Sequence, residues 1–213
     1  MAWVRRTIVM YVDLYLGAVI KLATLIQLSA GIYAIQAPGI PLSYEKAAQY
    51  AVAATYHGER AGIDPFELVG VARNESDFVE DMKGPDGKDC GLTQTRVTIT
   101  KFSCKQLRRS YWLAFQEAAR ELKEYGAACS GHADFDRCRL NHYNSGVRYA
   151  KHGVHGAYYL RVQCFSQAAR AGISVGQSCR RVFGRGDIAR TLRRAQPRPH
   201  DLIAVNSASR PET

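Results

Sequence analysis

Acidic residues are scarce in this chain of 213 residues, where 19 aspartates and glutamates face 29 lysines and arginines and leave a net charge of +10. The surplus favours anionic partners, among them nucleic acid, membrane surfaces and acidic polymers such as bacterial cell wall. Hydrophobic residues make up 46% of the sequence and charged residues 23%, which excludes wholesale disorder and collagen-like structure. The composition predicts a globular chain with a basic surface.

Several catalytic signatures are also missing. The sequence has no glycine-rich phosphate loop and no nucleophilic serine elbow. His152 and His155 form an H-x-x-H pair without the glutamate of a metalloprotease helix, so a zinc peptidase is not expected. There is no internal repeat and almost no strand signal, and the apolar spacing predicts a mainly helical fold.

The N-terminal segment has the pattern of an export signal. Arg5–Arg6 precede a long apolar run from Thr7 to about Ile35, which only Asp13 and Lys21 interrupt. Positive charge ahead of such a run is typical of secreted and membrane-anchored proteins, and the run is long enough to span a bilayer. The alternative is a buried amphipathic helix of a soluble protein.

The residues at the end of this segment do not decide whether it is cleaved from the mature protein. Small residues at Ser29–Gly31 suit cleavage, whereas Pro38 after Ala37 disfavours a cut at that point. Residues 37–41 break a helix and are interpreted as a linker. Residues 1–41 are therefore predicted to form a signal peptide or membrane anchor plus linker.

Six cysteines behind an export signal indicate an oxidising compartment and up to three disulfides, in fifteen possible connectivities. Cys129 and Cys138 are the favoured pair because they bracket a polar loop. The alternatives are a zinc site that adds His132 and His142 to these two cysteines, or six reduced thiols in a cytosolic protein. We expect no metal and no cofactor. The cysteines are Cys90, Cys104, Cys129, Cys138, Cys164 and Cys179.

Capping residues and apolar spacing predict the helices of the folded part. Ser43 is a suitable first cap, and Asp64 followed by Pro65, with Glu67 as a capping-box acid, is a strong start for the next helix. The expected elements are helices over about residues 43–62, 64–75, 106–125, 138–149 and 155–170, a loop over residues 80–91 and a short extended piece over residues 95–100. Residues 171–213 are predicted to form a basic, partly flexible extension, since ten arginines and three acids follow residue 160.

Four short elements occur in a characteristic order. Ala72–Ser76 places a carboxylate at the C-terminal end of an apolar helix, and Gly91–Gln94 follows the acidic loop. The Tyr143–Gly146 turn and the helix around Tyr158 come later in the chain. In this order and spacing, the elements resemble the lytic transglycosylases of the goose-type lysozyme superfamily, over roughly residues 44–168.

The resemblance implies a lysozyme-like single catalytic domain over residues 42–170. In that family one glutamate protonates the bond between N-acetylmuramic acid and N-acetylglucosamine, then accepts the proton of the muramyl 6-hydroxyl as a 1,6-anhydro ring closes. Glu75 matches this residue. Glycosidic cleavage needs an acid that is still protonated near neutral pH, and burial at the end of an apolar helix raises a glutamate's pKa.

The remaining residues that match the family are expected to line a sugar cleft. Tyr143 would donate a hydrogen bond to the acid, and Ser76 would fix the acid or bind the substrate's N-acetyl group. Hydrogen bonds within local turns are the alternative for the polar members. The expected substrate-binding residues are Ser76, Gly91, Leu92, Gln94, Tyr143 and Asn144.

Two positions depart from the family pattern. Two further acids leave open whether the reaction is transglycosylation or hydrolysis. Thr93 replaces the usual methionine of the turn, and His142 stands where a small residue is common. Asp86 and Asp89 lie near the position where goose-type lysozymes carry a water-positioning aspartate. Either one is a possible second acid, which would allow hydrolysis with carboxylates about 6.5–9.5 Å apart; solvated loop acids are the alternative.

The resemblance therefore predicts a peptidoglycan lytic transglycosylase that acts on glycan strands from the periplasmic face of the membrane. A muramidase hydrolase of the same fold is the first alternative. A non-catalytic wall-binding component of a secretion or phage assembly is the second. A nucleic-acid binder is not expected, because the folded part has no aromatic-basic recognition pattern.

Overall fold

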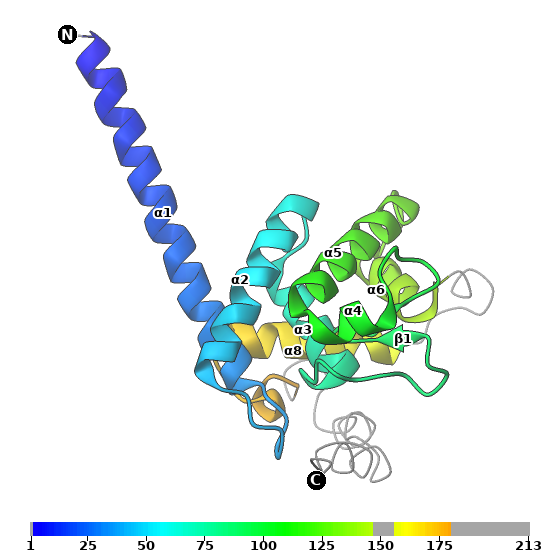
Figure 1. Cartoon of the computed structure of the whole chain (residues 1–213). Coiled ribbons are helices and arrows are strands. Elements are labelled where there is room, and N and C mark those ends of the chain that lie inside the picture. Colours follow the sequence, from blue (N-terminus) through cyan, green and yellow to red (C-terminus); the bar gives the residue numbers. More distant parts are fainter. Residues whose placement is uncertain (1, 147–155, 180–213) are drawn as a thin grey trace.

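The computed structural model describes residues 2–146 and 156–179, and these residues form a mainly helical body, as predicted (Figure 1). A two-stranded antiparallel piece pairs β1 (Asp89–Cys90) with β2 (Thr95–Arg96). Most of the predicted basic extension, from residue 180 onward, lies outside the described residues. The helices are α1 (Ala2–Ala34), α2 (Tyr44–Ala61), α3 (Pro65–Ser76), α4 (Cys104–Arg109), α5 (Tyr111–Ala128), α6 (Phe135–Ser145) and α8 (Gly156–Ala171), followed by helical residues 175–179.

Local capping sets the limits of α2 and α3, as the sequence predicted. The Ser43 side chain accepts a hydrogen bond from the Lys46 amide, and Gly62 ends α2 with a φ of 73°, which glycine adopts without strain. Asp64 caps α3 in the same way, with Pro65 as its first residue. Glu67 does not complete a capping box; it is buried and pairs with Arg139 of α6, 2.7 Å away.

The single helix expected over residues 106–125 is wrong, because the chain breaks at Ser110. Its backbone is extended, with φ −143° and ψ 98°, and its side chain accepts a hydrogen bond from the Leu113 amide. Ser110 therefore ends α4 and caps α5 at once. The spacing of apolar residues continues through the break, so periodicity alone did not reveal it.

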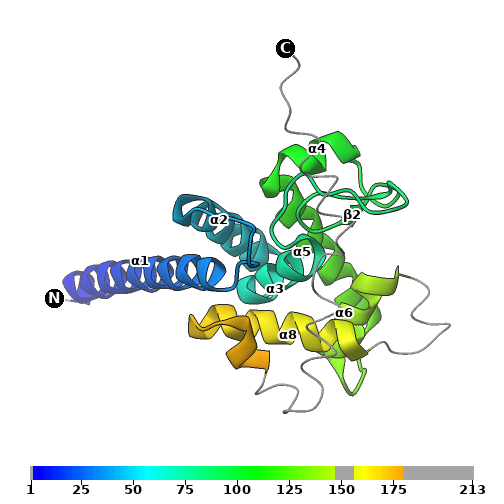
Figure 2. The same cartoon turned by 90° about the horizontal axis from the view of Figure 1, so that it is seen from below.

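Helix α3 lies at the centre of the body, and nine of its twelve residues are buried. Helix α8 lies beside it in both views (Figures 1 and 2). Gly70 permits this approach: a Cβ atom there would overlap Ser166 Oγ and lie 2.7 Å from the Val162 carbonyl oxygen. The two helices pack backbone against backbone at this point.

The last turns of α1 belong to the same core, while the first half of this helix projects away from the other helices (Figure 1). Leu28, Ile32 and Ile35 are fully buried. Arg73 Nε of α3 donates a hydrogen bond of 2.6 Å to the Ile35 carbonyl oxygen, and the same guanidinium pairs with Asp77. The segment predicted to be a signal or anchor thus shares the core of the folded domain at its C-terminal end.

All six cysteines form disulfides, and the predicted pair Cys129–Cys138 is confirmed. That pairing also removes two of the four ligands of the zinc alternative. The disulfides and the apolar N-terminal helix suggest an exported or membrane-anchored protein. The three bonds are Cys90–Cys104, Cys129–Cys138 and Cys164–Cys179, with Cα–Cα distances of 5.3, 5.9 and 5.0 Å.

We expect Gly70→Ala to lower the free energy of unfolding by about 1–3 kcal/mol, because the added methyl must push α3 and α8 apart. Gly176→Ala is the matched control, since a Cβ there would meet nothing within 4 Å. Denaturant unfolding of both variants measures the difference. Equal stabilities would contradict the close packing of α3 on α8.

The exported protein should contain no thiol that reacts with a chromogenic disulfide reagent before reduction, and six after reduction and unfolding. Cleaving a bond such as Cys164–Cys179, which joins residues 15 positions apart, should lower the free energy of unfolding by about 3 kcal/mol through the entropy gained by the unfolded chain. Six reactive thiols in the native exported protein would overturn the disulfides and the oxidising compartment together.

Candidate active site

The end of α3 presents the half-buried carboxylate of Glu75 to helix α8. The Tyr158 hydroxyl of α8 donates a hydrogen bond of 2.6 Å to Glu75 Oε1. One residue earlier, Asn74 Oδ1 accepts a hydrogen bond of 2.7 Å from Arg161 Nε, one turn further along α8. Two neighbouring polar side chains of α3 are therefore both held by α8.

Burial raises the pKa of Glu75 to about 7, against an ordinary value of 4.5. The hydrogen bond from Tyr158 and the positive charge of Arg161 lower this pKa, and the negative charge of Asp89 raises it, but burial has the largest effect. At neutral pH a large fraction of the Glu75 side chains therefore carries a proton. A carboxylic acid in this state can donate that proton to a leaving oxygen.

The turn Gly91–Gln94 is fixed next to this acid by hydrogen bonds to its carbonyl oxygens. The hydroxyl of Ser76, which is buried, donates to the Leu92 carbonyl at 2.6 Å and so ties the end of α3 to the turn. Within the turn, Gln94 Nε2 donates to the Gly91 carbonyl at 2.8 Å. Ser76 and Gln94 thus make internal contacts that hold the turn in position.

Tyr143 and Thr93 hold the other side of the turn. The Tyr143 hydroxyl of α6 donates a hydrogen bond of 2.9 Å to the Thr93 carbonyl oxygen. The Thr93 side chain, fully buried, donates to the Ala114 carbonyl of α5 at 3.1 Å. Thr93, which departs from the family pattern, therefore connects the turn to α5 and does not face the solvent.

Backbone strain is concentrated beside the same residues. Asp77, Phe78 and Gln94 have positive φ angles of 54°, 67° and 48°, and they are the only non-glycine residues of this kind in the described part of the chain. Each such conformation costs about 1–2 kcal/mol. Two of them directly follow Glu75–Ser76 and the third closes the turn, and strain of this kind tends to occur at functional sites.

The expected hydrogen bond from Tyr143 to the acid is not formed in the structure, where Tyr158 provides it. Tyr158 lies in one of the four elements that carry the resemblance, but its sequence context predicted no role for its side chain. Asn144 is exposed, and its amide donates to the Ser145 hydroxyl at 3.3 Å. The structure therefore brings Glu75, Ser76 and the turn together and leaves Asn144 at the surface.

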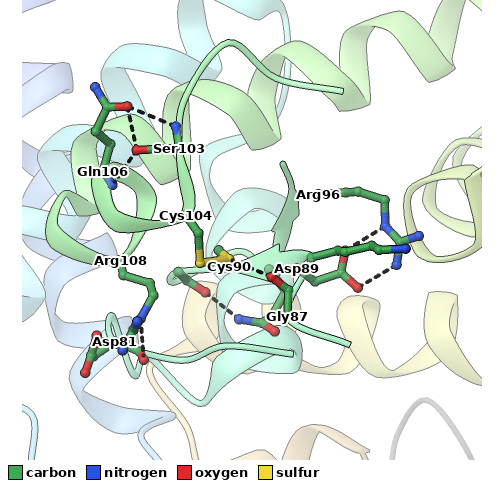
Figure 3. The surroundings of a disulfide bond; sticks show 12 residues. Asp81, Gly87, Asp89, Cys90, Arg96, Ser103, Cys104, Gln106 and Arg108 are labelled. Carbon is green, nitrogen blue, oxygen red and sulfur yellow. Dashed lines mark hydrogen bonds and ion pairs between the residues drawn. A yellow bond between two sulfur atoms is a disulfide. The ribbon is translucent and has the colours of Figure 1, made fainter. Parts of the chain in front are cut away.

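The two possible second acids both interact with Arg96 of β2, and Figure 3 shows the pairing of Asp89 with Arg96. Asp89 is half-buried and accepts two hydrogen bonds from Arg96, from Nε at 2.8 Å and Nη2 at 2.9 Å. Asp86 is exposed and lies 3.4 Å from Nη2. The Cys90–Cys104 disulfide fixes β1 next to these groups. Of the two acids, Asp89 is the one whose charge acts on Glu75.

The sequence did not predict another buried carboxyl group whose charge is coupled to Glu75. Glu121 of α5 is 5% exposed, and its Oε1 has no hydrogen-bond partner among the described residues. Burial raises its pKa to about 8, and the charge of Glu75 contributes to this rise. The spacing of Ala118 and Tyr125 around it, three residues before and four after, marked this position as part of the inner face of the helix.

The chain matches no protein-family model, no curated protein and no solved structure. The resemblance to the lytic transglycosylases therefore depends on the short motifs themselves and on the arrangement of their residues around Glu75.

Replacing Tyr158 by phenylalanine should raise the pKa of Glu75, because the hydroxyl stabilises the carboxylate and its loss favours the protonated form. Carbon-13 NMR titration of the glutamate carboxyl groups measures this pKa without any substrate. Tyr159→Phe is the matched control, since the two tyrosines are neighbours in α8 and the hydrogen bond comes from Tyr158. An unchanged or lowered pKa in Tyr158→Phe would contradict the proposed geometry.

Proposed function

We propose that the protein is a peptidoglycan lytic transglycosylase with a lysozyme-like fold and that Glu75 is its catalytic acid and base. The supporting observation is the half-buried Glu75 carboxyl, with a pKa raised to about 7 by burial, at the end of a buried helix and next to a fixed Gly-Leu-x-Gln turn. A buried carboxylate in this position destabilises the fold at high pH, which a purely structural role would not require.

In the first step of the proposed reaction, Glu75 donates its proton to the glycosidic oxygen as the bond between that oxygen and C1 of the N-acetylmuramyl residue breaks. The leaving sugar departs with a neutral hydroxyl group. The carboxylate formed on Glu75 is stabilised by the hydrogen bond from Tyr158 and by the positive charge of Arg161.

In the second step the muramyl 6-hydroxyl attacks C1 and transfers its proton to the Glu75 carboxylate. A bond forms between O6 and C1, the 1,6-anhydro ring closes, and Glu75 is again protonated. The substrate's acetamido group assists at C1, so the cycle needs no second protein carboxylate. No water molecule is consumed, and protons balance on a single residue.

Three features of the protein suit a long anionic polymer as the substrate. Carbonyl oxygens of the turn are occupied by Ser76, Gln94 and Tyr143, so the turn is rigid before substrate binds. The net charge of +10 attracts a wall polymer that carries peptide carboxylates. Three disulfides suit the oxidising periplasm, where this substrate lies.

A muramidase hydrolase is the second candidate, and Asp89 is the observation that favours it. Its charge acts on Glu75, as that of a water-positioning acid would. The two hydrogen bonds from Arg96 hold Asp89 in the loop, however, and this pairing favours the transglycosylase.

The product distinguishes these reactions. Mass spectrometry of fragments released from purified peptidoglycan should show 1,6-anhydromuramyl ends. Reducing muramyl ends would instead establish the hydrolase, with one water added per bond cleaved. A folded protein that releases no fragment would be a binding component and would overturn both enzymatic proposals.

Glu75→Gln should lower the rate of wall lysis at least about 100-fold, the usual contribution of a general acid–base group. The variant should be at least as stable as the unsubstituted protein at pH 8, because it no longer ionises a buried carboxyl above the pKa of about 7. Glu124→Gln is the control, since Glu124 is 60% exposed and pairs with Arg120 at the surface. A folded Glu75→Gln variant with a tenth of normal turnover would exclude Glu75 as the catalytic group.

A further inference from the structure

The C-terminal third of α1 is integrated into the domain by contacts on both sides of the predicted cleavage point. Leu28 and Ser29 are buried, and Gly31 packs against the backbone of Ala169 in α8, where a Cβ atom would overlap the Ala169 carbonyl. Gln27 Nε2 donates a hydrogen bond of 2.7 Å to the Arg170 carbonyl at the end of α8. Cleavage at Ser29–Gly31 would remove part of the core.

The contact between α1 and α2 extends further toward the N-terminus. Lys21 Nζ lies 3.2 Å from Glu59 Oε2, and the Tyr33 and Tyr44 rings meet edge to face with centroids 6.0 Å apart. The two helices therefore run antiparallel from Tyr33 back to Lys21. An ion pair with an exposed glutamate is compatible with water and not with the interior of a bilayer.

These contacts decide which part of α1 can enter a membrane. The 18-residue window Gly17–Ala34 is apolar enough to cross by composition, with a mean hydropathy of 1.4. One face of its C-terminal part is buried in protein, however, through Leu28, Ser29 and Ile32, and Lys21 lies beside α2. The first half of α1 projects away from the other helices (Figure 1).

The length and flanking charges of this projecting part suit a short span. Residues 7–20 contain one charged residue, Asp13, and form about 21 Å of helix. The hydrocarbon core is about 30 Å thick, and local thinning together with flanking cations accommodates a shorter segment. Arg5–Arg6 on one side and Lys21 on the other are cations at the expected boundaries, with the arginine pair on the cytoplasmic side.

We propose that α1 is retained in the mature protein, that the bilayer holds its residues 7–20, and that Lys21 marks the point where the chain enters the periplasm. Residues 22–35 are then the first helix of the exported domain and not part of the membrane span. The arrangement fixes the domain directly at the membrane surface, with no linker between the span and the core. This inference does not depend on the reaction proposed for Glu75.

Single cysteines introduced on either side of Lys21 test the boundary in the full chain. Gly17→Cys and Ile26→Cys are suitable, because Gly17 has nothing within 4 Å and Ile26 is 56% exposed. The unsubstituted chain is the control, since all six of its cysteines are paired. Intact cells with a permeabilised outer membrane are treated with a membrane-impermeant maleimide, and N-terminal sequencing of the purified membrane protein reports processing.

We expect labelling at position 26 in the intact membrane, labelling at position 17 only after detergent is added, and a mature N-terminus that precedes Arg5. Labelling at both positions without detergent would show that α1 does not enter the bilayer. Protection of both positions would show that the window Gly17–Ala34 is the span. A mature N-terminus beyond Lys21 would show that the segment is a cleaved signal. Each of these three results overturns the proposal.

Discussion

The burial of α3 on nearly all sides is the constraint on which the rest of the structure depends. Nine of its twelve residues are buried, and it contacts α1, α2, α5 and α8. A helix in this position needs a residue without a side chain where α8 crosses, which Gly70 provides. It also needs partners for any buried charge, and Arg73 finds them in the Ile35 carbonyl and Asp77. At the end of this helix Glu75 is half-buried.

Burial at the end of α3 affects both the protonation of Glu75 and the stability of the fold. Removing the Glu75 carboxyl from water raises its pKa to about 7, which makes it a proton donor near neutrality and destabilises the fold once the group ionises. The strained residues Asp77 and Phe78 add to this cost. The hydrogen bonds of Ser76 and Tyr158 partly offset it and hold the acid and the turn in one geometry. Stability is commonly lower at functional sites for this reason.

The N-terminal helix shows that one apolar run can have a projecting part and a part packed into a protein core. Its composition resembles that of a membrane span over nearly the whole length, since lipid and protein core select the same side chains. In the structure Lys21 pairs with Glu59 of α2, and further along the run Leu28, Ile32 and Ile35 are buried in the core. Because Arg73 donates a hydrogen bond to the Ile35 carbonyl and lies two residues before Glu75, the end of the apolar run and the candidate site are parts of one core.

Features that depend on residues close together in the chain could be predicted before the structure was known. Caps at Ser43 and Asp64 defined two helices, a polar loop indicated the disulfide Cys129–Cys138, and an apolar helix placed Glu75 at its end. These features follow from local hydrogen bonding and periodicity, which a single sequence displays.

Contacts between side chains of different helices depend on how the helices pack. The packing brings the Tyr158 hydroxyl, 83 residues away, to donate a hydrogen bond to Glu75, and it directs Tyr143 to the turn. It also buried Glu121 with one oxygen unsatisfied among the described residues, and it drew the end of α1 into the core. Several tyrosines near the motifs are chemically equivalent, and the choice among them depends on how α6 and α8 pack against α3, which no local pattern encodes.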